Sequence, residues 1–179
     1  ILFSLYSFSL ALWALGYTFM YSSSDMNKIW FWYKFSGFGW CYMHAFGLHF
    51  ALILSNKDKI FKNQLFWIVL YIAPTFFYSK VLFSKLFAFE FVLKDGDLTE
   101  IFAPTSIYML LYFIYHTIYL LLFIYFTWKW GRDSVKKSEK KQSKILVFVA
   151  FIPFLFGTLI DGILPILRIN HIKPLGILT

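Results

Sequence analysis

Cysteine is almost absent from this chain of 179 residues: Cys41 stands alone, inside an apolar run. A single cysteine cannot close an internal disulfide, and no Cys/His spacing indicates a metal site. Acidic residues are also scarce, 9 against 17 Lys and Arg, so that the net charge is +8. Because the basic residues fall in short segments between apolar runs, they indicate membrane topology and contact with anionic headgroups rather than nucleic acid.

Apolar residues make up 60% of the chain, aromatic residues 24%, and the mean hydropathy is +0.66. Soluble domains are nearer about 45–50% apolar, so the composition is that of a protein embedded in the lipid bilayer. We therefore expect an all-α integral membrane protein, an antiparallel bundle of transmembrane helices forming one domain over 1–179. Five full spans are expected, at about 1–21, 29–54, 65–83, 107–128 and 145–164, with the start of another from 175. Both chain ends lie within apolar runs, which predicts a domain truncated at both ends.

The stretch 129–144 (KWGRDSVKKSEKKQSK) separates two of these apolar runs. Its seven Lys and Arg against two acidic residues give a net charge of +5. We expect a basic cytoplasmic loop over 129–144, because loops on the cytoplasmic side carry excess Lys and Arg. The other basic loop, 55–64, lies two spans away and so falls on the same side. The acidic segment 84–106 then falls on the outer side.

Within 84–106, apolar residues alternate with others on both sides of Asp95-Gly96. Alternation that flanks an Asp-Gly pair is typical of a β-hairpin, since both residues tolerate the positive φ of a primed turn. The sequence therefore predicts a short extracytoplasmic hairpin that turns at Asp95 and Gly96. An interfacial helix over 85–93 is the alternative.

Three ionisable residues within the expected spans are candidates for function, His44, His116 and Asp161, because such groups are costly in hydrocarbon. The plainer interpretation is that each histidine is neutral and hydrogen-bonded, and that Asp161 lies near the interface. His44 and His49 are five residues apart and do not share a helix face, which argues against a two-histidine metal site. No catalytic, cofactor-binding or metal-binding residues are indicated, and no cofactor is expected.

Several stretches together resemble the N-terminal seven-transmembrane region of bacterial sensor histidine kinases. They are 11–17 (ALWALGY), 30–50 from WFW to LHF, Pro74 after a short basic loop, and 159–165 (LIDGILP) followed by Pro174. By this likeness the five spans correspond to the second to sixth helices of the unit.

The resemblance implies a sensory input module in the bacterial inner membrane. Such a module would pass a stimulus, either a small molecule or a signal derived from the membrane, to a cytoplasmic output domain in the same chain. A histidine kinase is the favoured output, and a homodimer is the implied assembly. The segment itself would not be an enzyme.

Two other classes stay open from the residues alone. A fragment of a membrane transporter or permease would show inverted repeats and broken helices that meet at mid-membrane, and we find no convincing repeat. A membrane-embedded enzyme would need a polar cluster at one membrane face, whereas His44, His116 and Asp161 are scattered along the chain.

Overall fold

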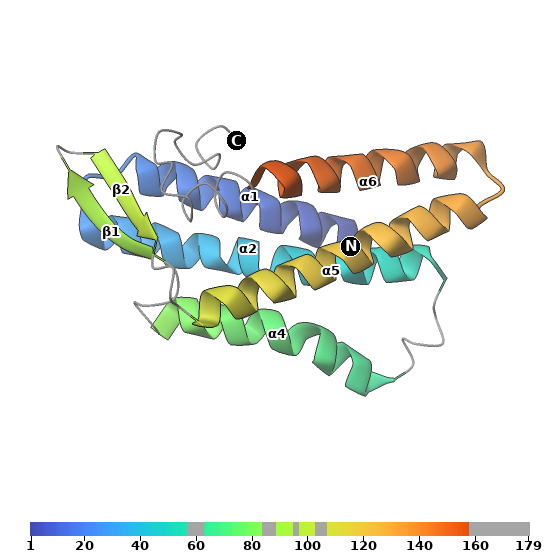
Figure 1. The fold of residues 1–179 in the computed structure, drawn as a ribbon, viewed down its shortest axis with the longest axis horizontal. Helices are drawn as coiled ribbons and strands as arrows, with labels where there is room; N and C mark the ends of the chain where they lie inside the picture. Colours follow the sequence, from blue (N-terminus) through green and yellow to red (C-terminus); the bar gives the residue numbers. More distant parts are fainter. Residues whose placement is uncertain (57–62, 84–88, 95–96, 103–106, 158–179) are drawn as a thin grey trace.

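The computed structural model describes residues 1–56, 63–83, 89–94, 97–102 and 107–157 (Figure 1). Five helices and one two-stranded sheet make up this part of the chain. In order they are α1 (Leu2–Tyr21), α2 (Met26–Leu54), α4 (Gln64–Phe83), β1 (Phe89–Lys94), β2 (Asp97–Phe102), α5 (Ile107–Asp133) and α6 (Lys137–Gly157).

Helices occupy the apolar stretches that the sequence marked as spans. Among the described residues, four helices are long and apolar enough to cross a bilayer: α1, α2, α4 and α5 from Leu110 to Asp133. The helix α2 begins before the expected position 29, because the Asp25 side chain accepts a hydrogen bond from the Asn27 N–H and caps the helix start. The expected span 145–164 is described only as far as Gly157, and the start from 175 lies outside the described residues. The count of five full spans stays a prediction.

The basic stretch 129–144, expected as a cytoplasmic loop, is mostly helical, and its place on the cytoplasmic side stays a prediction. The helix α5 continues to Asp133 and α6 begins at Lys137, so only 134–136 are non-helical. Lys, Arg and Glu are good helix formers, and charge therefore ends the hydrocarbon-facing part of a helix without ending the helix. The basic stretch is two charged helix ends joined by a tight turn.

The hairpin prediction is confirmed where the structure describes it. Strands β1 and β2 pair antiparallel, from Phe89 opposite Phe102 to Lys94 opposite Asp97. An interfacial helix over 85–93 is therefore wrong for 89–93. The predicted turn residues Asp95 and Gly96 lie outside the described residues.

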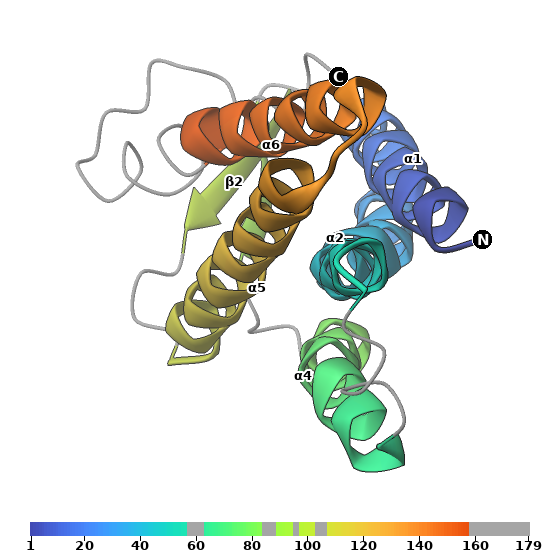
Figure 2. The ribbon, with the colours of Figure 1, turned by 90° about the vertical axis from the view of Figure 1, so that its right-hand side faces the viewer.

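The helix α2 occupies the centre of the bundle. In its most apolar stretch, 61% of the residues are buried, against 11–22% in the other three candidate spans. Figure 2 looks along the bundle and shows α1, α4 and α5 around α2, with α6 beside α5. The hairpin lies at one end of the bundle, whereas the α5–α6 turn and the end of α2 lie at the other (Figure 1). We call these the hairpin end and the basic end; the extracytoplasmic side of the hairpin stays a prediction.

Small residues place α1 directly against α2. A Cβ atom on Gly39 would meet the Ser9 carbonyl oxygen, and one on Gly16 would lie 2.5 Å from the Ser36 Cβ. Close approach through small residues is a common way for helices to pack in membranes, where no hydrophobic effect drives them together. The α1–α2 pair is therefore held by near-backbone contact.

Candidate functional site

The hairpin packs against the bundle through apolar side chains of both strands: Phe91 is buried in the core cluster, and Leu93 and Leu98 pack against that cluster. Phe91 of β1 is 5% exposed, and its ring centroid lies 4.8 Å from that of Trp30 and 5.1 Å from that of Tyr33, both on α2. Both contacts are edge-to-face, the geometry that aromatic quadrupoles favour. Val92, the next residue along the strand, is 38% exposed. One face of the strand thus packs against the start of α2, and the other is open.

Three tyrosines of α5 hold it against the middle of the bundle. The hydroxyl of Tyr112 donates to the Trp40 carbonyl at 3.1 Å, and that of Tyr115 donates to the Cys41 carbonyl at 2.7 Å. One turn further, the Tyr119 hydroxyl donates to a carbonyl of α4, that of Leu70, at 3.0 Å. Residues three and four apart share a helix face, so these three hydroxyls line the side of α5 that faces its neighbours.

Two histidines meet beside these tyrosines, His44 in ring contact with Tyr115 and His116 with Tyr112. The rings of His44 on α2 and His116 on α5 have centroids 4.0 Å apart, with their planes at 74°. His44 is 7% exposed, and its Nε2 has no hydrogen-bond partner among the described residues. The fold therefore brings two ionisable side chains into contact inside the bundle, a placement that commonly marks functional residues in membrane proteins.

His49 lies on another side of α2 and has a different environment. Its Nδ1 is 2.8 Å from the Tyr71 hydroxyl of α4, and its ring centroid is 3.8 Å from that of Trp67. The separation of His44 from His49 follows the sequence prediction, since five helical residues turn through about 140°. Among the described residues, no three His, Cys, Asp or Glu side chains are grouped closely enough to hold a metal ion.

The basic end has its own polar contacts. The Glu139 carboxylate accepts a hydrogen bond from the Ser134 hydroxyl at 2.6 Å and lies 3.2 Å from the Lys136 ammonium. These contacts, the Ser134 hydrogen bond first, lower the pKa of the Glu139 carboxyl below its usual value. Nearby, the Ser143 hydroxyl donates to the Thr127 carbonyl at 2.7 Å. The turn and the start of α6 are thus tied to the end of α5.

The structure pairs two of the three candidate intramembrane residues, His44 with His116, while Asp161 lies outside the described residues. The sequence held a signal for that pairing. Counted from the basic ends of the expected spans, the two histidines lie ten and twelve residues in, at depths of about 15 and 18 Å. Phe91 and the tyrosines of α5 were missed, because aromatic residues are so frequent in this chain that no single one stands out.

Comparison with known proteins bears on this arrangement. The family model for the N-terminal 7TM region of histidine kinase matches residues 1–177. The chain belongs to this family. No curated protein and no solved structure matches it. A 7TM region of this kind is a non-catalytic input domain, and it points to the sensory module of a signalling receptor.

Membership of the 7TM family also fits the physical character of the chain. A membrane-embedded helical bundle is what the family suggests and what four span-length helices support. A histidine kinase input domain suggests, in turn, a cytoplasmic output domain in the same chain. The family match favours the sensory interpretation over the transporter and the membrane-embedded enzyme.

Proposed function

We propose that this 7TM region senses a stimulus at its hairpin end, on the outer side of the membrane, and passes it through the α2–α5 contact to a cytoplasmic histidine kinase in the same chain. The observation that carries the proposal is the burial of Phe91 between Trp30 and Tyr33. A hairpin held this way cannot tilt or shift without disturbing the first turns of α2. A small molecule, or a change in the membrane surface, that moves the hairpin would therefore act on the central helix.

The contacts that follow supply a route to the basic end. The helix α2 meets α5 through the tyrosine hydroxyls and through the His44–His116 contact. The helix α5 then continues without interruption to Asp133, and Ser143 ties α6 to it. For a stimulus to be transmitted, the bundle needs two arrangements that differ in their affinity for it. A shift of α5 along α2 is the difference that these contacts favour.

The proposal is tested by removing the Phe91 ring in the full-length protein. We expect Phe91→Ala in lipid vesicles to change the kinase autophosphorylation rate roughly 2- to 12-fold, because an aromatic contact contributes about 0.5–1.5 kcal/mol to such an equilibrium. With spin labels at positions 56 and 137 in a Cys41→Ala background, Phe91→Ala should shift the distribution of distances between the end of α2 and the start of α6.

The matched control is Val92→Ala, which trims a side chain on the open face of the same strand. It should leave both the autophosphorylation rate and the label distance unchanged. Equal effects of Phe91→Ala and Val92→Ala, or no effect of either, would refute the role of the Phe91 contact.

The nature of the output domain has its own test. The reading frame beyond Thr179 should lead into a helical linker and a histidine kinase domain. Further spans with no soluble domain would overturn the sensory role.

We also propose a homodimer in the bacterial inner membrane, which cross-linking of the full-length protein in native membranes would reveal as a species of twice the mass.

A further inference from the structure

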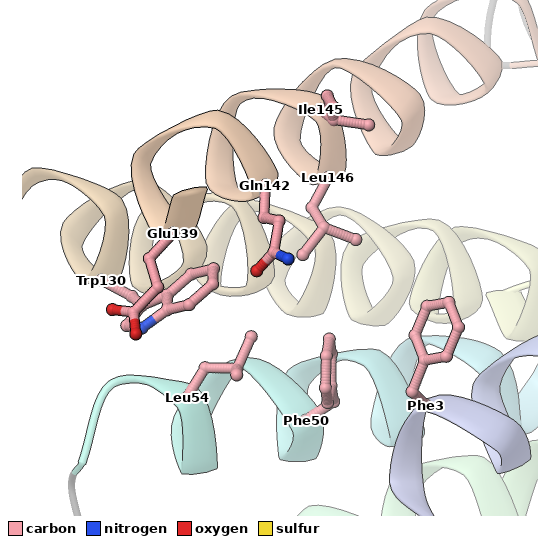
Figure 3. A pocket seen from close by; sticks show the side chains of 8 residues that line it. All are labelled: Phe3, Phe50, Leu54, Trp130, Glu139, Gln142, Ile145 and Leu146. Atoms are coloured by element: carbon pink, nitrogen blue, oxygen red, sulfur yellow. The ribbon is translucent and has the colours of Figure 1, made fainter. Parts of the chain in front are cut away.

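A pocket of about 360 Å³ lies at the basic end, between the ends of four helices (Figure 3). Its apolar lining comes from α1, α2 and α6: Phe3, Phe50, Leu54, Ile145 and Leu146. Trp130 of α5, with Glu139 and Gln142 of α6, completes the wall. A volume in this range is typical of small-ligand sites.

The pocket is polar at one end and apolar at the other. In Figure 3, Glu139 and Trp130 lie together at one end, Phe3 lies at the other, and the Gln142 side chain points into the space above Phe50. The charged part of α6 ends at Lys144 and its apolar part begins at the next residue, Ile145. The pocket therefore crosses the level at which headgroups give way to hydrocarbon, and an occupant must be amphiphilic.

The charge around the polar end favours an anion. The stretch 129–144 carries a net charge of +5, and the acidic wall residue, Glu139, is already bonded to Ser134 and Lys136. Lys141 is exposed and lies one helical turn before Ile145, about 40° around the helix from it. Lys141 does not line the pocket, but it precedes the lining residues Gln142 and Ile145 on α6. Because helical side chains tilt toward the N-terminus, its ammonium extends toward the aqueous side of both.

We propose that this pocket binds a phospholipid with an anionic headgroup from the surrounding leaflet. One acyl chain lies against Phe3, Phe50 and Leu146, and the phosphate is held near Gln142 and Lys141. The lipid then bridges α6 to α1 and α2 at the end of the bundle from which an output domain would follow. The site does not depend on the signalling role proposed above, because the pocket and its charge are independent of the hairpin.

Native mass spectrometry of the full chain in detergent micelles tests the site. The probes are phosphatidylglycerol and phosphatidylcholine with identical acyl chains. We expect phosphatidylglycerol to be retained preferentially by the wild-type chain. Lys141→Gln should weaken its retention about fivefold, as expected for one basic residue near a membrane surface. Leu146→Trp, which fills the apolar end, should abolish it.

Two variants of α6 serve as matched controls. Lys140→Gln removes the same charge about 140° around the helix from Ile145, and Phe148→Trp enlarges a side chain that is 65% exposed and outside the pocket. Both should retain phosphatidylglycerol as the wild type does.

Equal retention of the two lipids by the wild type would overturn the proposal. So would equal losses in Lys140→Gln and Lys141→Gln, which would show general attraction to a basic surface. If another protein segment filled the pocket, Leu146→Trp would lower the unfolding temperature without changing lipid retention, and that outcome would also overturn it.

Discussion

The hydroxyl of Tyr115 offers the sharpest test of how α5 is held to α2. The Tyr115 side chain is buried, and its hydroxyl donates to the Cys41 carbonyl at 2.7 Å. Its ring also contacts those of Tyr119 and Phe77, at centroid distances of 4.5 and 5.3 Å. Tyr115→Phe keeps the ring and removes only the donor. The Cys41 carbonyl lies within α2, where a helical N–H also binds it, so no acceptor is left bare.

The expected cost of Tyr115→Phe is therefore that of one interhelical hydrogen bond in a membrane, about 0.6 kcal/mol and at most about 1.7. Replacing Tyr112 and Tyr119 as well should bring the total to about 2 kcal/mol if the three bonds act independently. Reversible unfolding in mixed micelles, driven by SDS and followed by tryptophan fluorescence, measures the free energy directly.

The control for Tyr115→Phe is Tyr125→Phe on the same helix, where the side chain is 48% exposed. It should change the unfolding free energy by less than about 0.3 kcal/mol. If the two variants proved equally stable, the tyrosine hydroxyls of α5 would not hold the helices together. A loss far above about 2 kcal/mol from Tyr115→Phe would instead show that the ring had moved.

Three further predictions concern other contacts. Gly39→Ala should lower the unfolding free energy by about 1–3 kcal/mol in the same assay, because the new Cβ meets the α1 backbone. Gly47→Ala should cost less, because its Cβ meets only the edge of the Tyr6 ring at 3.3 Å. His44→Phe should be at least as stable as the wild type, since it removes a buried nitrogen that has no partner among the described residues; a loss above about 1 kcal/mol would contradict this. The contacts that lower the pKa of the Glu139 carboxyl stabilise the turn at pH values above 4.5, its value in the unfolded chain. This stabilisation is lost as the pH falls through the lower pKa of the folded state. NMR titration of the Glu139 carboxyl should give a midpoint below 4.5, and Ser134→Ala should raise it.

The sequence predicted the helices and the hairpin because each leaves a local signal. Apolar runs long enough for a bilayer became α1, α2, α4 and α5, and alternation around Asp95-Gly96 became two paired strands. The helical structure within 129–144 was not predicted, because hydropathy reports where hydrocarbon ends and not where the backbone stops hydrogen-bonding. Lys and Glu have high helix propensity, so a helix can continue through them into water.

The contacts of the candidate site were harder to predict because they depend on which helices are neighbours. His44 and His116 are 72 residues apart, and their contact requires both the pairing of α2 with α5 and the rotation of each helix about its axis. Neither is determined by hydropathy in a chain whose spans are apolar on nearly every face. The burial of Phe91 likewise depends on where the hairpin folds back, which its own alternation cannot specify.

The two interfaces of α2 differ in a way that bears on movement. Against α1 it presents Gly39 and Ser36, where backbones nearly touch and a slide would drive atoms into one another. Against α5 it is contacted by ring edges and tyrosine hydroxyls, which can reorient or choose a neighbouring carbonyl. We therefore expect α1 and α2 to move as one body and α5 to shift with α6. Spin labels at Leu5 and Asn56, on α1 and at the end of α2, should keep one distance in Phe91→Ala while the Asn56–Lys137 distance changes. A change in the first distance with none in the second would place the moving interface between α1 and α2 instead.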